Sequence, residues 1–209
     1  MEYKYIDLGS FPRRAHFDYF RSFAYPYVGY TVKVDATDFV RRQKEHGAPF
    51  FLSFCYCAER AANSVAEFRQ RIRGDGIVEY DWCPSSYTLA LDNGTYCYCM
   101  LDSRMPFSEF LPEAQERQAE AMSSESLDDG DDAESLLFIS SNPWLSYDAF
   151  VQPVPYPADS NPRISIGKYY TDGGRVLFPV TVLCNHALVD GKHIAEFFSA
   201  LDMELSSVF

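Results

Sequence analysis

The sequence contains no apolar run near the ~18 residues that a membrane-spanning helix requires, and its first residues lack the basic start and apolar core of a secretory signal. Basic residues are also fewer than acidic residues. Lys and Arg number 18 against 30 Asp and Glu, which gives a formal net charge of −12. A nucleic acid duplex or an anionic membrane would repel such a surface. We therefore expect a cytoplasmic protein that binds neither nucleic acid nor a membrane.

Cysteine motifs for zinc are missing as well. The chain has 6 Cys, but the two close pairs are spaced Cys-x-Cys, and no Cys-x-x-Cys or Cys/His knuckle occurs. Cys55 and Cys57, like Cys97 and Cys99, lie among aromatic residues and leucines, where small apolar side chains pack well. We predict reduced, buried thiols rather than disulfides or a zinc site.

An acidic run follows in "SSESLDDGDDAE", where 6 of 12 residues are Asp or Glu. The simplest interpretation of this run, centred on residues 125–134, is a solvated loop. Calcium binding by Asp128, Asp129, Asp131 and Asp132 is the alternative, although the run does not follow the EF-hand register. The sequence does not say whether the run has a partner.

What the chain does have is a composition typical of a packed globule, with 209 residues, 47% apolar residues and 16% aromatic residues. No repeat or linker divides it, so we expect one domain over residues 1–209. Helical and alternating patterns interleave, which predicts a mixed α/β order. Helices are expected at 16–24, 38–46, 49–65, 106–122 and 190–205, and strands at 27–37, 76–81, 86–92, 95–101, 135–141, 163–170 and 175–186.

Three local features refine this order. Asp92-Asn93-Gly94 separates two alternating segments and predicts an antiparallel hairpin, because Asn-Gly tolerates positive φ. Pro179 cannot donate to a ladder, so the last strand should be bulged, at an edge or unpaired at that point. The final helix carries an apolar stripe that should cover a sheet, formed by Ile194, Phe197, Phe198 and Leu201.

His186 and Asp190 are four residues apart in "CNHALVDG". On one continuous helix they would share a face and could bind a metal together. An apolar strand runs up to Asn185, however, and Asp190-Gly191 is typical of a helix start with Asp190 as N-cap. His186 is then a strand-end residue, which suits either a general base in a cleft or a satisfied core histidine.

The segment "NHALVDG", preceded by "VLFPVTVLC", resembles the His-x-x-x-Asp-Gly signature of the trimeric chloramphenicol acetyltransferases. Further stretches similar to that family occur in the same order along the chain: "RRAHFDYFR", "EFRQRIRGDGIVEYDWCPSSYT", "FISSNPWLSYDAF" and "SIGKYYTDGGRVLFPV". The resemblance runs from about Tyr3 to Glu204. It implies an α/β fold, a two-layer sandwich with a mixed, largely antiparallel sheet covered by helices, and a homotrimer with active sites between subunits.

The resemblance also implies an acyltransferase that uses acetyl-CoA as co-substrate and holds no permanently bound cofactor and no metal. His186 would be the general base, since imidazole titrates in the useful range. Ser140 would stabilise the oxyanion of the tetrahedral intermediate, with Ser141 as the alternative. Asp190 would support the site by pairing with Arg13. Arg14 is the alternative partner.

Substrate contacts follow from the same resemblance. For coenzyme A it implies Trp144, Lys168 and Tyr169, although ordinary strand packing with a surface lysine would also account for them. For the acceptor it implies Tyr19, Phe20, Val28, Tyr96, Phe150, Arg163 and Ser165.

The acceptor positions are where the chain departs from the family. Tyr19-Phe20 reverses the usual Phe-Tyr order, Val28 replaces an aromatic residue, and Arg163 replaces an aliphatic one. A guanidinium group there would attract a carboxylate or phosphate on the acceptor. Chloramphenicol is the leading acceptor, with antibiotic resistance as the corresponding role. The alternatives are another hydroxyl or amine acceptor, a non-catalytic small-molecule binder and a metal-dependent hydrolase.

Overall fold

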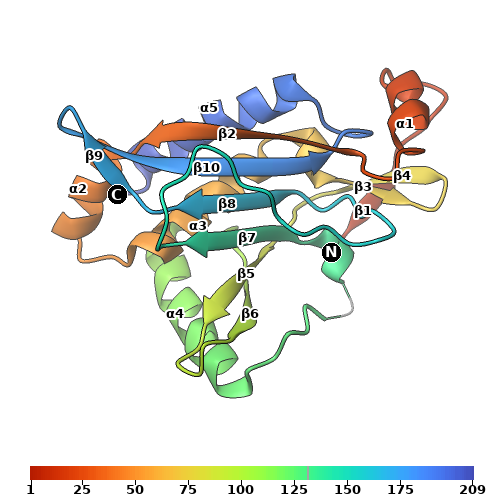
Figure 1. Cartoon of the computed structure of the whole chain (residues 1–209). Coiled ribbons are helices and arrows are strands. Elements are labelled where there is room, and N and C mark those ends of the chain that lie inside the picture. Colours follow the sequence, from red (N-terminus) through yellow and green to blue (C-terminus); the bar gives the residue numbers. More distant parts are fainter. Residues whose placement is uncertain (131) are drawn as a thin grey trace.

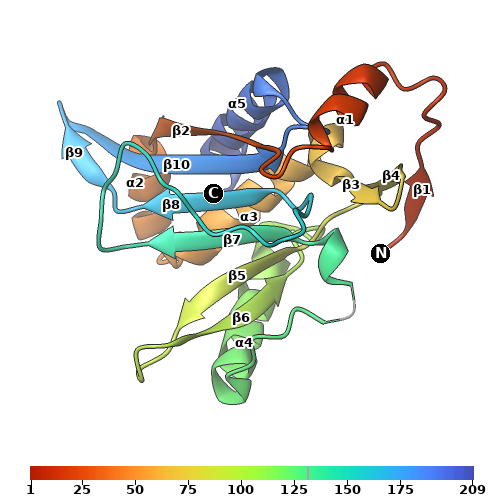
Figure 2. The ribbon, with the colours of Figure 1, turned by 45° about the vertical axis from the view of Figure 1, so that its right-hand side comes forward.

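The computed structural model describes residues 1–130 and 132–209 and has two layers, a main sheet and helices packed on one of its faces (Figure 1, Figure 2). The helices are α1 (Arg14–Phe20), α2 (Thr37–Glu45), α3 (Phe50–Asn63), α4 (Phe107–Ser124) and α5 (Gly191–Ser207), with 3₁₀ turns at Ala66–Arg69 and Ala133–Ser135. The strands are β1 (Tyr3–Tyr5), β2 (Tyr27–Asp35), β3 (Gln70–Arg73), β4 (Gly76–Tyr80), β5 (Ser85–Ala90), β6 (Tyr96–Leu101), β7 (Leu137–Asn142), β8 (Arg163–Gly167), β9 (Tyr170–Asp172) and β10 (Arg175–Asn185).

The main sheet follows the order β2-β10-β8-β7-β5-β6, and the short β9 pairs with β10. β7 runs parallel to β5 and to β8, whereas the other neighbours in this sheet are antiparallel. A second sheet, β1-β4-β3, lies near α1 (Figure 2). The expected α/β sandwich with a mixed, largely antiparallel sheet is confirmed.

Apolar faces decide which helices cover the sheet. α3 is buried over most of its length, and its Phe54 contacts Phe178 of β10 with ring centroids 5.6 Å apart. α5 buries Ile194, Phe197 and Leu201, which belong to the predicted apolar stripe. α2, α3 and α5 lie on the far side of the sheet in Figure 2. The hydrophobic core therefore fills the space between these helices and one face of the sheet.

The opposite face of the sheet carries a row of hydroxyl groups. Ser140 of β7 is in register with Ser165 of β8. Ser165 is in turn opposite Thr181 of β10, which is opposite Thr31 of β2. Directly paired residues point to the same side of a sheet, so these hydroxyls all project away from the helices. The connection formed by residues 143–162 crosses the same face (Figure 1).

The predicted hairpin and the predicted irregularity at Pro179 have different outcomes. β5 and β6 pair antiparallel across the turn, where Gly94 has φ 84° and the Leu91 N–H donates to the Thr95 carbonyl. The hairpin is therefore confirmed. β10 is an interior strand, which excludes the edge position for Pro179. Its register with β8 begins one residue later, at Val180, so Pro179 is unpaired on that side, which is another of the three expected alternatives.

The cysteines and the acidic run also have a place in the structure. All six cysteines are buried and free, in agreement with the predicted thiols. Asp131 of the acidic run lies outside the described residues. Within residues 1–130 and 132–209, no group of three or more His, Cys, Asp or Glu side chains could hold a metal ion. No helix in that part of the chain is both long and apolar enough to span a membrane.

Candidate active site

His186 stands in the turn that follows β10, and its ring is held by the backbone. Its Nδ1 lies 2.8 Å from the carbonyl oxygen of Val189. A carbonyl only accepts hydrogen bonds, so Nδ1 carries the proton and the neutral ring presents an unprotonated Nε2. The ring also stacks on Phe20 of α1, with centroids 4.0 Å apart. The half-buried imidazole is thus fixed in the tautomer that a general base needs.

The end of β10 is anchored on both sides of this ring. The His186 N–H donates to the Pro26 carbonyl at 2.6 Å. The side chain of buried Asn185 accepts from the Ala187 N–H at 3.0 Å and donates to the Asp159 carbonyl at 2.9 Å. These hydrogen bonds brace the turn that carries His186.

The start of α5 fixes the carbonyl that holds His186. Asp190 is the N-cap of α5, as predicted, and accepts from the Lys192 N–H at 3.0 Å. Arg13 forms an ion pair with Asp190, whereas Arg14 pairs with Asp18 on its own helix. Burial acts to raise the pKa of the Asp190 carboxyl, but the hydrogen bond from Lys192 and the charge of Arg13 outweigh it and lower the pKa.

Ser140 belongs to a short chain of side-chain hydrogen bonds. Its hydroxyl lies 2.7 Å from that of Ser165, which donates to Oε1 of Gln152 at 3.2 Å. The Nε2 atom of Gln152 is buried and has no partner among the described residues. Nothing in the sequence pointed to Gln152, because it lies in the connection between β7 and β8 without a motif around it.

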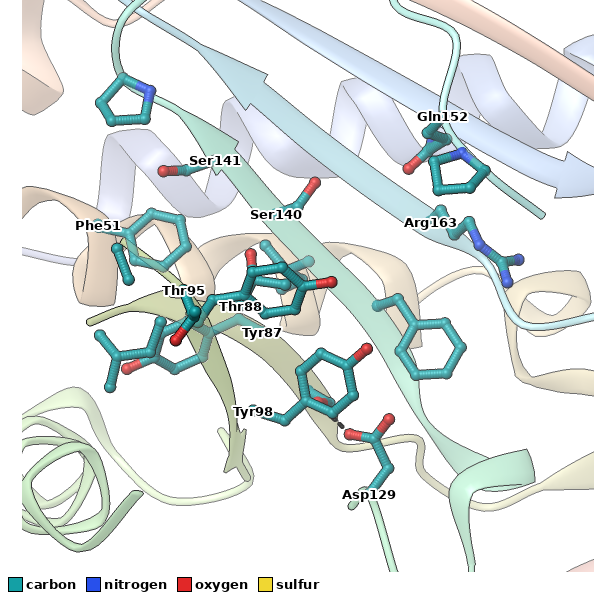
Figure 3. A pocket seen from close by; sticks show the side chains of 18 of the residues that line it. Phe51, Tyr87, Thr88, Thr95, Tyr98, Asp129, Ser140, Ser141, Gln152 and Arg163 are labelled. Carbon is teal, nitrogen blue, oxygen red and sulfur yellow. Dashed lines mark hydrogen bonds between the residues drawn. The ribbon is translucent and has the colours of Figure 1, made fainter. Parts of the chain in front are cut away.

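A cavity of about 920 Å³ opens on the hydroxyl-bearing face of the sheet (Figure 3). Its walls include strands β5, β6 and β7 and part of the connection between β7 and β8. Ser140 and Gln152 lie on one side of it, and Asp129 lies beside Tyr98 on the other (Figure 3). The size and the aromatic lining are those of a site for a drug-sized molecule.

The predicted site residues fall into two groups. The cavity is lined by Tyr96, Ser140, Trp144, Phe150 and Arg163, with Ser165 hydrogen-bonded to Ser140 and Ser141 also in the wall. The His186 region holds Phe20, with Tyr19 packed on Phe20, and Val28 paired with Cys184 of β10.

Lys168 and Tyr169 lie beyond the end of β8, outside both groups. The Lys168 N–H donates to the Leu145 carbonyl at 2.8 Å, which brings the predicted coenzyme residues next to the Trp144 turn. Trp144 and Tyr169 are 73% and 49% exposed, so both rings are open to a ligand.

One chain does not bring His186 and Ser140 together. Ser140 shares its row with Thr181, and His186 follows Thr181 by five residues along β10 and lies two strands away from β7. At about 3.3 Å per residue and about 4.8 Å per strand, the Cα atoms are roughly 19 Å apart. His186 does not line the cavity. Within one subunit His186 and Ser140 are too far apart to contact the same atom of a ligand.

Arg163 is already paired within the chain. Its guanidinium donates to both carboxylate oxygens of Asp159, at 2.8 and 2.6 Å, and to the Asn161 carbonyl. Asp159 also accepts from the Tyr27 hydroxyl at 2.9 Å. Because this carboxylate neutralises the guanidinium, the expectation of an anionic group on the acceptor loses its basis.

Comparison with known proteins agrees with the sequence motifs. The family model described as "Chloramphenicol acetyltransferase" matches residues 1–202. The chain is 29% identical to a chloramphenicol acetyltransferase of Proteus mirabilis, over 94% of this chain and 91% of that protein. It is 30% identical to chloramphenicol acetyltransferase 2 of Escherichia coli, and the match covers 100% of this chain and 99% of that protein. A solved chloramphenicol acetyltransferase aligns with a TM-score of 0.86 and 26% identity, covering 98% of this chain and 100% of the other. A probable dihydrolipoamide acetyltransferase from Listeria monocytogenes shares the fold, with a TM-score of 0.69 and 16% sequence identity.

Proposed function

Because the chain belongs to the chloramphenicol acetyltransferase family and is an acyltransferase of that family, we propose that it transfers an acetyl group from acetyl-CoA to a hydroxyl of chloramphenicol or a molecule of similar size. The observation that carries the proposal is the geometry of His186. A backbone carbonyl fixes its protonated nitrogen, and the other nitrogen is left as a base at the open end of a strand.

In this proposal the two halves of the site come together only with a second copy of the chain. We propose a homotrimer in which His186 of one subunit meets the acceptor cavity of the next. The roughly 19 Å between His186 and Ser140 in one chain supports this arrangement. So does the edge strand β2, whose Tyr30 and Val32 are 51% and 38% exposed although both are large apolar residues. Such residues at a sheet edge suit an interface between subunits.

The chemistry then proceeds in two steps. Nε2 of His186 accepts the proton of the acceptor hydroxyl while that oxygen bonds to the thioester carbonyl carbon of acetyl-CoA. The carbonyl electrons move onto oxygen and form the tetrahedral oxyanion. When the oxyanion collapses, the carbon–sulfur bond breaks and the thiolate leaves with the proton from the imidazolium. The products are the acetyl ester and free coenzyme A.

The oxyanion needs a hydrogen-bond donor, and Ser140 supplies one in this proposal. A donor of this kind contributes about 3 kcal/mol to lowering the barrier. The Gln152 amide can be placed in two orientations related by a flip. If Nε2 faces Ser165, then Gln152 donates to Ser165, Ser165 donates to Ser140, and the Ser140 proton is free for the oxyanion. This orientation also gives the unpartnered Nε2 an acceptor.

Coenzyme A is proposed to approach from the end of the sheet where Trp144, Lys168 and Tyr169 gather. Lys168 would meet a phosphate of the coenzyme, and the exposed Trp144 and Tyr169 rings would stack on its apolar or adenine parts. The hydrogen bond between Lys168 and Leu145 holds these segments side by side, which supports a shared ligand.

Thiol release tests the proposal. Purified protein is supplied with acetyl-CoA, with and without chloramphenicol, and free thiol is followed over time. We expect release that depends on the acceptor and falls to background in His186→Ala. His46→Gln is the matched control, because His46 is exposed and stacks on Phe209, and neither residue belongs to the candidate site. Tight binding of chloramphenicol without thiol release would instead identify a non-catalytic binder.

A further inference from the structure

Charge in the acceptor cavity is not balanced. Its lining includes the charged residues Asp129, Asp159 and Arg163. Arg163 and Asp159 form a two-point ion pair, so their charges cancel within the wall. Asp129 is left as a carboxylate that faces the cavity (Figure 3).

The surroundings of Asp129 leave its charge uncompensated. The Ser86 hydroxyl donates to Oδ1, and no basic side chain among the described residues pairs with it. Burial raises the pKa of the Asp129 carboxyl, the hydrogen bond from Ser86 lowers it, and the charge of Asp128 raises it again, with a net upward shift. A half-buried carboxylate without a cation is costly, and a ligand that brings a positive charge would relieve that cost.

The walls beside Asp129 are also suited to a cation. Tyr98 lies next to it in Figure 3, and Tyr87 and Phe138 line the same cavity. Aromatic faces attract ammonium groups, and the attraction is strongest where water is excluded. A carboxylate with aromatic rings around it is the usual chemistry of an amine-binding site, whereas a single carboxylate is too few ligands for a calcium ion.

Register gives the span between this carboxylate and the reacting centre. Ser86, which holds Asp129, is opposite Phe138 of the parallel strand β7, and Ser140 follows two residues later. The Cα atoms of Ser86 and Ser140 are then about 8 Å apart. One small molecule with a hydroxyl at one end and a charged group at the other can reach both.

We propose that the acceptor is a hydroxylated aromatic compound with a protonated amine at the end remote from the hydroxyl that is acetylated, and that Asp129 binds this amine. The inference deepens the proposed function and rests on it, because Ser140 marks the reacting end of the cavity only if the protein is an acetyltransferase. It makes the cavity selective for cations, the opposite of what the presence of Arg163 alone suggested.

A series of three acceptors that differ in one ring substituent, which is cationic, neutral or anionic, tests the inference. Chloramphenicol carries a neutral nitro group on its ring, at the end remote from its primary hydroxyl. Two analogues replace that group with an aminomethyl group, which is cationic, or a carboxyl group, which is anionic. We expect kcat/KM to fall in the order cation, neutral, anion, with about a tenfold preference for the cation over chloramphenicol.

Variants then assign the preference to one residue. In Asp129→Asn the ratio of kcat/KM for the cationic over the neutral compound should drop to about one. In the control Asp128→Asn, which keeps the oxygen that accepts from the Gly130 N–H, the ratio should remain as in the wild type. An equal ratio in wild type and Asp129→Asn, or no preference for the cation in the wild type, would overturn the inference.

Failure of the proposed function has a different signature. If the wild type releases no thiol with any of the compounds, it is not an acetyltransferase for this class. Calorimetric binding of the same three compounds to the wild type then still decides the inference. Tighter binding of the aminomethyl compound than of the other two supports it, and equal or weaker binding contradicts it.

Discussion

Removing the carboxylate of Asp190 is expected to harm the protein more than removing its partner, the guanidinium of Arg13. Asp190 caps α5 through the Lys192 N–H and pairs with Arg13 at the same time. In Asp190→Ala the loss of the cap costs about 1 kcal/mol of stability. The substitution also leaves the Arg13 guanidinium, which is only 16% exposed, without its partner, and an unpaired buried charge costs at least about 3 kcal/mol. Together these give a loss of about 4 kcal/mol in the free energy of unfolding.

Arg13→Met should cost less. The Nε and Nη2 atoms of Arg13 are buried without partners among the described residues, and the substitution removes them while the methionine keeps the packing of the stem. The remaining Asp190 carboxylate is one-third exposed and keeps its cap bond. We expect Arg13→Met to lose about 1–2 kcal/mol in the free energy of unfolding. The double variant Arg13→Met/Asp190→Ala should lose about the same, because it leaves no unpaired charge.

Urea unfolding at one fixed subunit concentration measures these free energies, since association contributes to them in an oligomer. The turnover number is measured in parallel, because Val189 next to Asp190 holds the His186 ring. Arg14→Met is the control, with an expected change below about 0.5 kcal/mol for an exposed pair. Equal losses for the two single variants, or a double variant equal to their sum, would refute the reasoning.

Two further predictions concern Gln152 and Glu59. Gln152→Glu should lower kcat more than Gln152→Leu, with little change in KM. A carboxylate at position 152 forces Ser165 to donate to it, so Ser140 donates to Ser165 and its proton is drawn away from the oxyanion. Equal effects of the two substitutions in steady-state assays would contradict this. Burial raises the pKa of Glu59 to about 7, although hydrogen bonds from Ser103 and Ser85 oppose the rise. The folded protein therefore holds this proton more tightly than the unfolded chain, and that stability is present below about pH 4.5 and is lost as the pH rises through about 7. Thermal unfolding between pH 5 and 8 should show wild-type stability falling relative to Glu59→Gln, and parallel curves would contradict the assignment.

Strong local patterns were enough to predict most of the main sheet and the covering helices. The hairpin at Asn93-Gly94 follows from turn chemistry, and Asp190 as an N-cap follows from the change of period at the end of β10. The short strands β1 and β3 were missed because three or four residues carry too little pattern, and each exists through its pairing with β4.

The residues of the candidate site could likewise be predicted only where a local pattern marks them. His186 could be placed at a strand end from its neighbours, but the residue chosen to pair with Asp190 came from the family resemblance alone. Gln152 was not found, and Asp129 was considered only as a calcium ligand of the acidic run. Both lie in connections whose course over the sheet is set by tertiary packing, so their places in the cavity could not be predicted. The partner of Arg163 was missed for that reason too: Asp159 precedes β8 in an irregular segment, where a spacing of four residues predicts no contact.

The central claim is that His186 acts on an acceptor held by a neighbouring subunit. His186→Ala and Ser140→Ala chains, each inactive by itself, can be co-expressed in equal amounts with different tags. If the site joins His186 of one subunit to Ser140 of the next, every mixed trimer contains one intact site, and the mixture should recover about a quarter of the wild-type rate. Co-expression of two differently tagged His186→Ala chains controls for the procedure. A mixed preparation no more active than its parents would contradict the account.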